Sequence, residues 1–520
     1  MTYTLKTAGA VVIEDLTLTT CLGDTINIQP QMVSININED MFAPCLTGSI
    51  QLEDGIGLLE KLPISCNEKL TILFYSYDYS PLNRECDFFH RTFDILKITN
   101  ITSITDYTKS YVLHFASPEL KMNETIKISK AYQSMSISQV VAAIMTGAYS
   151  SDTENPDGLN FPTSPLAEKR KYIRSPHLQP SEIETELMNL SPQNSVELFV
   201  EKTKYTEPWI TIPYSRPFTA IRNLCARAIR LSGGRFGAAN SGQVANFVFF
   251  ENKRGFQFTS IETLLENKDE KNPLVVFKFG DAAQNSTDQR TVEHQTIDDI
   301  QFLTTFDVID QIQNGTYASK LITYDMVTGE MRETDYDFAK QFDNTESTES
   351  FSGKKVWPSI FLDENNSSEL TTKAFSKLMF LPQNPTLAID NITSSTTQRL
   401  NNSQTLLGPE EFVARRLSQL GRLSNIRLAV KIAGNSRYKA GDLVELDLRQ
   451  MPLNFQRGQK LTEEQVKYYS GNYLITSISH QIGRINYSQT IEMVKDSHKE
   501  KIGSIGAHNP STPDIIGPKQ

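Results

Sequence analysis

Two pairs of adjacent carboxylates are the groups in this sequence best suited to acid–base chemistry. They are Glu39-Asp40 and Glu53-Asp54, within the stretch SININEDMFAPCLTGSIQLED of residues 34–54. Carboxylates on different strands can act together in glycoside hydrolysis. Around each doublet, however, apolar and polar residues alternate, which predicts strands whose successive side chains point to opposite faces. Only one member of each doublet can face a given side, so we interpret the doublets as strand ends and not as a catalytic pair.

Other catalytic signatures are missing from the sequence. It contains no G-x-x-x-x-G-K-[ST] loop, no G-x-S-x-G elbow and no H-E-x-x-H helix, so it lacks the residues that cradle phosphate, activate a serine or hold a protease zinc. The seven histidines are never three to five residues apart, and the five cysteines include no C-x-x-C pair. We therefore expect no catalytic residue, no cofactor and no metal site, with His480 and reduced cysteines packed in the core.

Length, charge and hydropathy indicate how many domains the chain has and which general functions are disfavoured. The 520 residues correspond to about three domains at one domain per ~150 residues. The net charge is -10, without clusters of Lys and Arg, which disfavours stable binding of nucleic acid but is compatible with its transient passage. The N-terminal residues do not form a signal-peptide pattern, and no apolar run approaches ~18 residues, so we expect neither export by such a signal nor membrane insertion.

Alternation of apolar and polar residues predicts one antiparallel β domain over residues 26–117. A short apolar segment within it, residues 56–62, is expected to form a turn that ends at Pro63. The strands are expected near residues 35–37, 50–52, 70–74, 93–104 and 109–115.

Three helices are predicted from apolar stripes at helical spacing and from their end signals. The first lies near Ser138–Met145. The second spans about Arg216–Leu231, with Ser215 as its expected cap. The third covers residues 410–420 and is expected to end at Gly421.

Two hairpins are predicted in the middle of the chain. FVFFENKRGFQF, residues 247–258, places aromatic runs on both sides of a polar loop, and residues 320–324 and 331–336 flank a Val-Thr-Gly turn. The phenylalanines of the first hairpin could stack a sugar or a base, but such residues on a hairpin are more typical of a core.

The most regular alternation lies near the C-terminus. In SNIRLAVKIAG, residues 424–434, apolar side chains occupy one face. Further strands are expected at residues 443–448, 473–482 and 486–494. Three polar segments without periodicity are expected to be exposed: a loop at residues 150–171, a linker at residues 344–354, and a tail from Asp496 that orders only against a partner.

The order of these segments resembles the baseplate hub proteins of contractile-tailed bacteriophages. The E-D-M-F link, the G-S-I-Q-L-E-D strand, the apolar turn ending in L-P-I and the E-K-L-T-I-L-F strand are similar to the first tube-type domain of that family. SRPFTAIRNLCARAI, NFVFFENKRGFQF and GTYASKLITYDMVTGEM resemble its middle part. YKAGDLVELDL, GNYLITSISHQI and YSQTIEMVKDS resemble its second tube-type domain, which late-control and type VI spike proteins share. The resemblance runs from about Ile26 to Lys495, and residues 150–171, 344–368 and the tail depart from it.

The resemblance implies an α+β fold, mainly antiparallel β, with two tail-tube-type β-barrel or sandwich domains and helix-containing insertion domains between them. The implied domains are residues 1–125 (first tube-type domain), 126–265 (helix-containing middle domain with the Phe-rich hairpin), 266–408 (second middle region with the polar linker), 409–496 (second tube-type domain) and 497–520 (C-terminal tail).

The resemblance also implies a structural, non-enzymatic function. A homotrimer would present six similar domains and act as a pseudo-six-fold adaptor between the six-fold tail tube and the three-fold central spike, with an acidic channel that phage DNA passes transiently. The expected partners are the spike, tail tube or tube-initiator proteins and baseplate wedge proteins, in a virion tail assembled in the host bacterial cytoplasm. The candidate ring-interface, tube-interface or lumen residues are Glu39, Asp40, Met41, Phe42, Glu53, Asp54 and Asp442.

Two other functions are compatible with the sequence. One is a tail-associated, polysaccharide-degrading enzyme that uses distant Asp and Glu residues, and the other is a carbohydrate-binding adhesin built on the Phe-rich hairpin. The missing catalytic motifs and the ordered resemblance favour the structural hub.

Overall fold

The computed structural model describes residues within the ranges 8–146, 197–266, 275–349 and 377–498. The longer gaps inside these ranges are residues 78–85, 232–244, 280–294, 383–408 and 451–463, and the predicted loop at 150–171 lies outside the described residues. Most elements belong to one 14-stranded, largely antiparallel sheet, with three smaller sheets beside it. The predicted fold class, mainly antiparallel β with helices between the β units, is confirmed.

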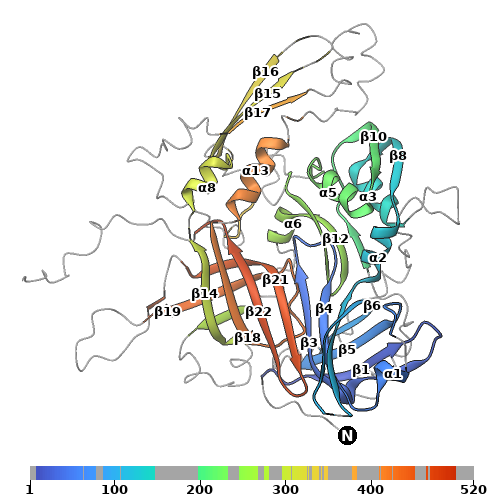
Figure 1. The fold of residues 1–520 in the computed structure, drawn as a ribbon. Helices are drawn as coiled ribbons and strands as arrows, with labels where there is room; N and C mark the ends of the chain where they lie inside the picture. Colours follow the sequence, from blue (N-terminus) through green and yellow to red (C-terminus); the bar gives the residue numbers. More distant parts are fainter. Residues whose placement is uncertain are drawn as a thin grey trace, which may run out of the picture.

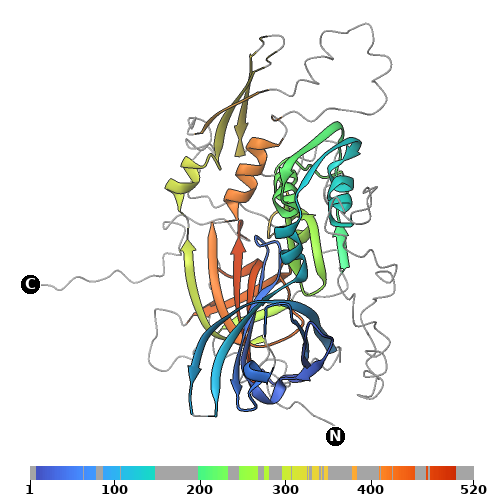
Figure 2. The same cartoon turned by 45° about the vertical axis from the view of Figure 1, so that its right-hand side comes forward.

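The N-terminal strands form a curled sheet that we call the first barrel. Its order is β3-β4-β7-β6-β5-β1-β2, all antiparallel, and Figure 2 shows it wrapping around its own core. The alternating side chains predicted to be apolar fill that core, including Ile35, Ile50 and Leu113. The strands are β1 (Val12–Thr19), β2 (Thr25–Asn27), β3 (Met32–Asp40), β4 (Thr47–Asp54), β5 (Lys69–Tyr77), β6 (Cys86–Ser103) and β7 (Lys109–Ala116).

The second barrel is assembled from C-terminal strands and two strands from the middle of the chain. Its order is β14-β18-β22-β21-β19-β13, and a bridge between Lys278 and Thr296 brings β13 back beside β14. Its core includes Leu428, Val430 and Ile491. The strands are β13 (Val276–Phe279), β14 (Ile297–Thr305), β18 (Ile426–Ala433), β19 (Leu443–Gln450), β20 (Glu464–Gln465), β21 (Gly471–Gly483) and β22 (Tyr487–Lys495).

One strand joins the two barrels into a single sheet. The first residues of β21 pair with β19 inside the second barrel, from Gly471 to Leu474. Its last residues pair with β3 of the first barrel, from Ser477 opposite Asp40 to Gly483 opposite Ser34. We call this β3–β21 contact the seam, and Figure 1 shows the two barrels side by side across it.

A middle region packs above the first barrel (Figure 1). The predicted Phe-rich hairpin is confirmed as β11 (Phe247–Asn252) and β12 (Gly255–Ser260), and β9 (Glu197–Val200) pairs in parallel with β12. A two-stranded ribbon of β8 (Ile128–Ser136) and β10 (Thr206–Ser215) shares its core. The helices of this region are α2 (Pro118–Thr125), α3 (Ile137–Thr146), α5 (Pro217–Cys225) and α6 (Ile261–Leu265).

A small sheet stands away from both barrels (Figures 1 and 2). It contains the second predicted hairpin, β15 (Ala318–Tyr324) and β16 (Met331–Asp337), with β17 (Leu378–Pro382) added in parallel to β15. Two helices, α8 (Val308–Gln313) and α13 (Val413–Arg422), connect it to the second barrel.

The helix ends differ from the predicted ones. α3 lies where the sequence predicts it, but α5 begins at Pro217 after Arg216 and already ends at Cys225. The Arg416 side chain of α13 explains that end, because its Nη1 donates to the carbonyl of Cys225 at 3.0 Å and so satisfies a group that a longer helix would use. α13 itself continues through Gly421 to Arg422.

The predicted polar linker and the start of the predicted tail are buried. Residues 345–349 are each at most 5% exposed, and residues 496–498 at most 3% exposed. Glu349 Oε1 lies 3.0 Å from Lys495 Nζ and accepts a hydrogen bond from the Asn472 amide at 2.9 Å. The expectation of an exposed linker is therefore wrong for residues 345–349, because their polar groups find partners on β21 and β22.

The buried Glu349–Lys495 ion pair gives a stability prediction. Glu349→Gln or Lys495→Met alone should lower the free energy of unfolding by about 3–5 kcal/mol, because each leaves a buried charge unpaired. The double variant should lose less than the sum of the two single losses. Urea unfolding of the four proteins measures this, with the exposed Arg427–Glu492 pair as control, where removing one charge should cost about 0–1 kcal/mol. Strictly additive losses at 349 and 495 would contradict the pairing.

Candidate functional site

The structure separates the two carboxylates of each doublet, as alternation in a strand predicts. Glu39 and Asp54 are buried, whereas Asp40 is half-buried and Glu53 is exposed. Asp54 accepts hydrogen bonds from the amides of Ile56 at 3.1 Å and Leu59 at 3.2 Å. It thereby holds the turn into the short helix α1 (Leu58–Lys61).

Glu39 belongs to the seam. Its Oε2 accepts a hydrogen bond from the Ala440 amide at 3.0 Å, and its Oε1 lies 3.6 Å from His480 Nε2. His480 Nδ1 is 2.7 Å from the Tyr487 hydroxyl. The prediction of a core histidine is confirmed, and this histidine faces a buried carboxylate of the other barrel.

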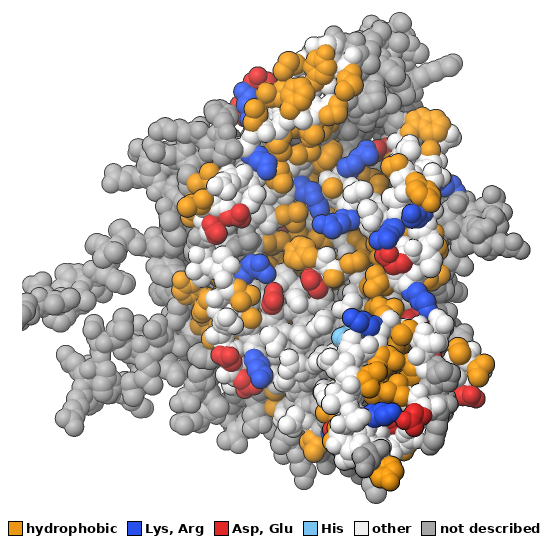
Figure 3. Space-filling view, viewed as in Figure 1, with side chains coloured by type: hydrophobic (Ala, Val, Ile, Leu, Met, Phe, Trp, Pro, Cys, Tyr) orange, Lys and Arg blue, Asp and Glu red, His pale blue; other side chains and the backbone are white. Residues whose placement is uncertain are grey.

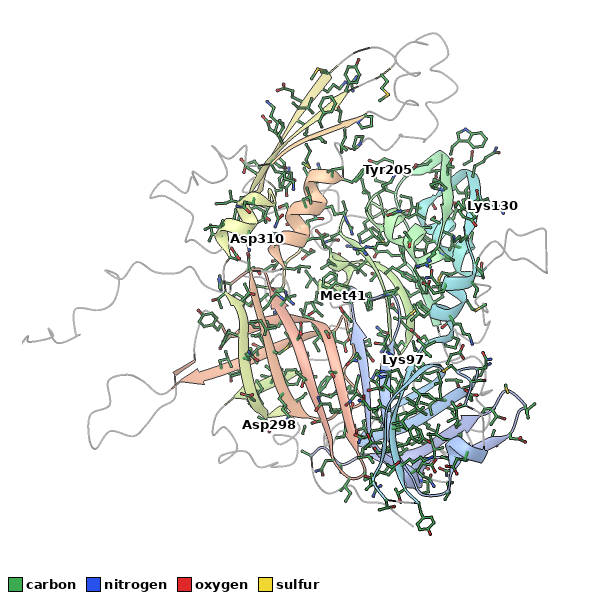
Figure 4. All side chains as sticks on the ribbon, viewed as in Figure 1. Met41, Lys97, Lys130, Tyr205, Asp298 and Asp310 are labelled. Atoms are coloured by element: carbon green, nitrogen blue, oxygen red, sulfur yellow. The ribbon has the colours of Figure 1, made fainter. Side chains whose placement is uncertain are left out.

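The link after β3 joins the first barrel to the second barrel, to the middle region and to α13. Met41 is fully buried, and its amide donates to the Thr476 carbonyl at 2.8 Å, which extends the seam. Its side chain belongs to a cluster with residues of the second barrel, β11 and α13, including Leu474, Phe250 and Leu420. Figure 4 places Met41 at this junction.

The seven candidate interface or lumen residues thus divide into two groups. The side chains of Glu39, Met41 and Asp54 are buried inside the chain. Phe42 is 61% exposed. The other three, Asp40, Glu53 and Asp442, are at least partly accessible.

Buried carboxylates with raised pKa values are the remaining candidates for acid–base chemistry. Burial raises the pKa of Glu251, yet its Oε2 accepts from the Leu46 amide at 2.9 Å and the Ser117 hydroxyl at 2.5 Å, which joins β11 to the first barrel. Burial also raises the pKa of Glu262 to about 8, against the opposing effect of Arg422. Both side chains are at most 2% exposed, so their geometry is that of structural links.

A metal site, a glycan-binding surface and a membrane span are three further possibilities for the described residues. Within the described ranges, no three His, Cys, Asp or Glu side chains are grouped to hold a metal ion. Phe247, Phe250, Phe256 and Phe258 are fully buried, so the predicted core role is confirmed for these four. Phe249 is half-buried and packs against the same core. No described helix is long and apolar enough to cross a membrane.

Eight consecutive strands of the large sheet share one bare face. In the order β6-β7-β4-β3-β21-β22-β18-β14, the apolar side chains point into the two barrel cores and the opposite face is polar. Figure 3 shows this face as largely uncharged side chains. Its uncharged members include Ser34, Asn36, Asn38, Thr47, Ser49, Gln51, Ser479, Gln481, Ser488 and Thr490.

The two ends of this eight-strand face are free. In the described part of the chain, β14 pairs only with β18, and β6 beyond Ile95 pairs only with β7. Both ends expose large apolar side chains: Leu96 and Ile101 on β6 are 39% and 60% exposed, and Phe302 and Leu303 on β14 are 42% and 41% exposed. Free strand edges with exposed apolar residues are typical of surfaces that another chain covers.

These edges form the candidate functional site that the sequence analysis missed. The bulky residues of β14 do not alternate cleanly with polar ones, so periodicity did not reveal this strand. The exposed Ile-Thr-Asn-Ile run at the end of β6 was predicted as strand, but sequence gives no sign that its edge is free.

The raised pKa of Glu262 predicts a pH dependence. Because its pKa rises from 4.5 to about 8 on folding, the folded chain binds more protons than the unfolded chain between these values. Stability should therefore fall as pH rises, by up to about 1.4 kcal/mol per pH unit. Glu262→Gln should flatten this slope and raise the melting temperature at pH 9 while changing little at pH 4. Glu60→Gln, at an exposed position, serves as the control. Equal slopes in the wild type and in Glu262→Gln would show that Glu262 does not cause the pH dependence of stability.

Comparison with known proteins gives structural neighbours only. No protein-family model and no curated protein matches the sequence. The tail protein of Neisseria meningitidis MC58 is 8% identical, with a TM-score of 0.43 over 94% of this chain and 96% of that chain. The 43 kDa tail protein of prophage MuSo2 from Shewanella oneidensis is 8% identical, with a TM-score of 0.45 over 93% and 98%. The E. coli c3393 protein, a type VI secretion component, is 9% identical, with a TM-score of 0.34 over 95% and 79%. The neighbours of this chain are therefore phage-tail and tail-like secretion proteins.

Proposed function

We propose that the chain is a structural hub of a contractile phage tail baseplate. Three copies would close into a ring of six β units, with the six-fold tail tube on one side and the three-fold spike on the other. The chain would act without catalysis, as a component of the virion. Wedge proteins of the baseplate would surround this ring.

The observation that carries the proposal is the eight-strand sheet with two free edges. A single chain leaves both edges and their apolar side chains in water, which invites uncontrolled association. A closed ring removes every free edge, because each copy supplies the partner that its neighbour lacks. The two barrels of each chain, joined by the seam, would then contribute one third of a continuous wall.

The bare polar face would line the channel of this ring. Its charged side chains are of both signs. Arg427 lies 3.4 Å from Glu492, Lys431 opposes Asp299 on the neighbouring strand, and Arg484 lies 3.7 Å from Glu53. Such a wall is close to neutral, which replaces the acidic lumen expected from the sequence. Neutral serine, threonine, asparagine and glutamine side chains do not displace the counterions condensed on DNA, so a phosphate backbone would pass without being held.

The domain boundaries proposed from the sequence fit this arrangement with one change. The second tube-type unit would include β13 and β14, which precede residue 409, because both strands complete the second barrel. The proposed second middle region would then be restricted to the small projecting sheet and its connections.

The mass of the purified chain in solution tests the proposal. Light scattering should give three times the chain mass of 58.6 kDa, either alone or when the spike protein is added. A chain that stays monomeric at high concentration with the spike present would contradict the hub. A matched control is the triple exchange Ile101→Lys, Phe302→Lys and Leu303→Lys, which should keep the monomer folded by circular dichroism and abolish the trimer.

A further inference from the structure

The two barrels repeat one pattern of strand pairing. In each barrel the first part of a long strand pairs with one neighbour and the remainder pairs with another. β6 pairs in this way with β5 and then β7, and β21 pairs in this way with β19 and then β22. The order β3-β4-β7-β6-β5 thus corresponds to β14-β18-β22-β21-β19.

Two irregularities of the ladders fall at matching positions. β6 passes over Leu96 in its pairing with β7, and β21 passes over Thr476 in its pairing with β22. β3 passes over Val33 beside β4, and β14 passes over Asp298 beside β18. Bulges are specific local features of a strand, so the coincidence of these two indicates a structural repeat.

Each free-edge strand also has one further register shift that its equivalent lacks. On β6 it lies between Thr99 and Thr102, and on β14 it lies between Phe302 and Thr304, whereas β21 beside β22 and β3 beside β4 have no second shift.

The repeat allows residues to be matched one to one through their ladder partners. Thr99 opposes Val112 on β7, as Ser479 opposes Thr490 on β22. The matches that matter for the edges are Thr99 with Ser479, Thr102 with Gln481, Gln301 with Asn36, and Thr304 with Asn38.

The two strand edges that pair with each other at the seam correspond to the two edges that are free at the ends of the sheet. The last part of β21 pairs with β3 from Ser34 to Asp40, and the equivalent segments are the last part of β6 and β14 from Asp299 onward. These equivalents are the two free edges. The seam is therefore one example, within a single chain, of the strand pairing that the free edges of β6 and β14 lack.

The direction of the strands agrees with this equivalence. Each of the seven neighbouring pairs from β6 to β14 is antiparallel, so β6 and β14 run in opposite directions. Rotation about an axis along the strands preserves their direction. The β14 edge of one copy would thus meet β6 of the next in antiparallel orientation, as in the seam.

We infer that the second half of β6 pairs with β14 of a second copy of this chain in the register of the seam. In the seam, Ser479 opposes Asn38 and Gln481 opposes Asn36. The matched contacts place Thr99 opposite Thr304 of the partner subunit, and Thr102 opposite Gln301 of the partner subunit. The inference rests on the proposed ring and specifies which edges close it and at which residues.

Paired cysteines test the register. Directly opposed residues of an antiparallel pair have Cα atoms about 4.5–5.5 Å apart, within the range that a disulfide spans. All variants carry Cys21→Ser, because Cys21 is an exposed thiol. The in-register variants are Thr99→Cys with Thr304→Cys, and Thr102→Cys with Gln301→Cys.

The matched out-of-register control is Thr99→Cys with Asp299→Cys. Asp299 lies five positions from Thr304, about 16 Å along the strand, which is beyond disulfide reach. Each single-cysteine variant reports the background from the remaining native thiols. All positions are on the polar face, so the substitutions leave the barrel cores intact.

After mild oxidation, at least one in-register variant should run as a covalent trimer on a non-reducing gel, at least tenfold above the out-of-register control. Light scattering of the same variants under reducing conditions separates the two proposals. A trimer whose in-register cysteines do not cross-link, or cross-link no better than the control, would overturn the edge contact and leave the hub standing. A monomer under reducing conditions, with the spike present, would overturn both.

Discussion

The antiparallel ladder between β3 and β21 is the constraint on which the rest of the structure depends. It joins strands more than 400 residues apart in sequence, from Ser34–Gly483 to Asp40–Ser477, into one sheet. Because side chains alternate along a strand, a slip of one residue would turn the polar face inward on one barrel. The Glu39–His480 contact and the Met41 cluster stand at this ladder and secure its register. With the register set, both barrels present their polar faces on the same side.

Much of the barrel architecture follows from local pattern. Strands β3, β4, β18, β22 and the second half of β21 alternate because each has one buried and one bare face, and the Phe-rich hairpin lies mostly in the core as its composition predicts. The seam could not be predicted, since nothing local in β3 or β21 specifies a partner so distant in sequence. Residues 345–349 were misread because their composition is polar, and only the three-dimensional position of Lys495 shows why Glu349 is buried.

Only part of the candidate site could be predicted from the sequence. Adjacent carboxylates were expected to face opposite sides, and they do. Glu39, Met41 and Asp54 are buried within the chain, because a polar or sulfur-containing side chain at a strand end can serve a junction inside the chain as well as a surface outside it. The role of the candidate residues at a lumen or interface stays a prediction. The edges of β6 and β14 become visible only when strand pairing is known, since a free edge is defined by a missing neighbour. Their apolar side chains then connect packing to assembly: the groups that the fold leaves uncovered are those that a ring would bury.

We propose that three copies of the chain close into a ring around a polar channel, and end-on images of the purified assembly by electron microscopy would show such a ring. We expect three-fold symmetry, six similar lobes and an open central channel, in which the β14 end of one chain adjoins the β6 end of the next. A compact particle without a channel, or a ring whose chains meet through the projecting sheets while β6 and β14 remain free, would contradict it.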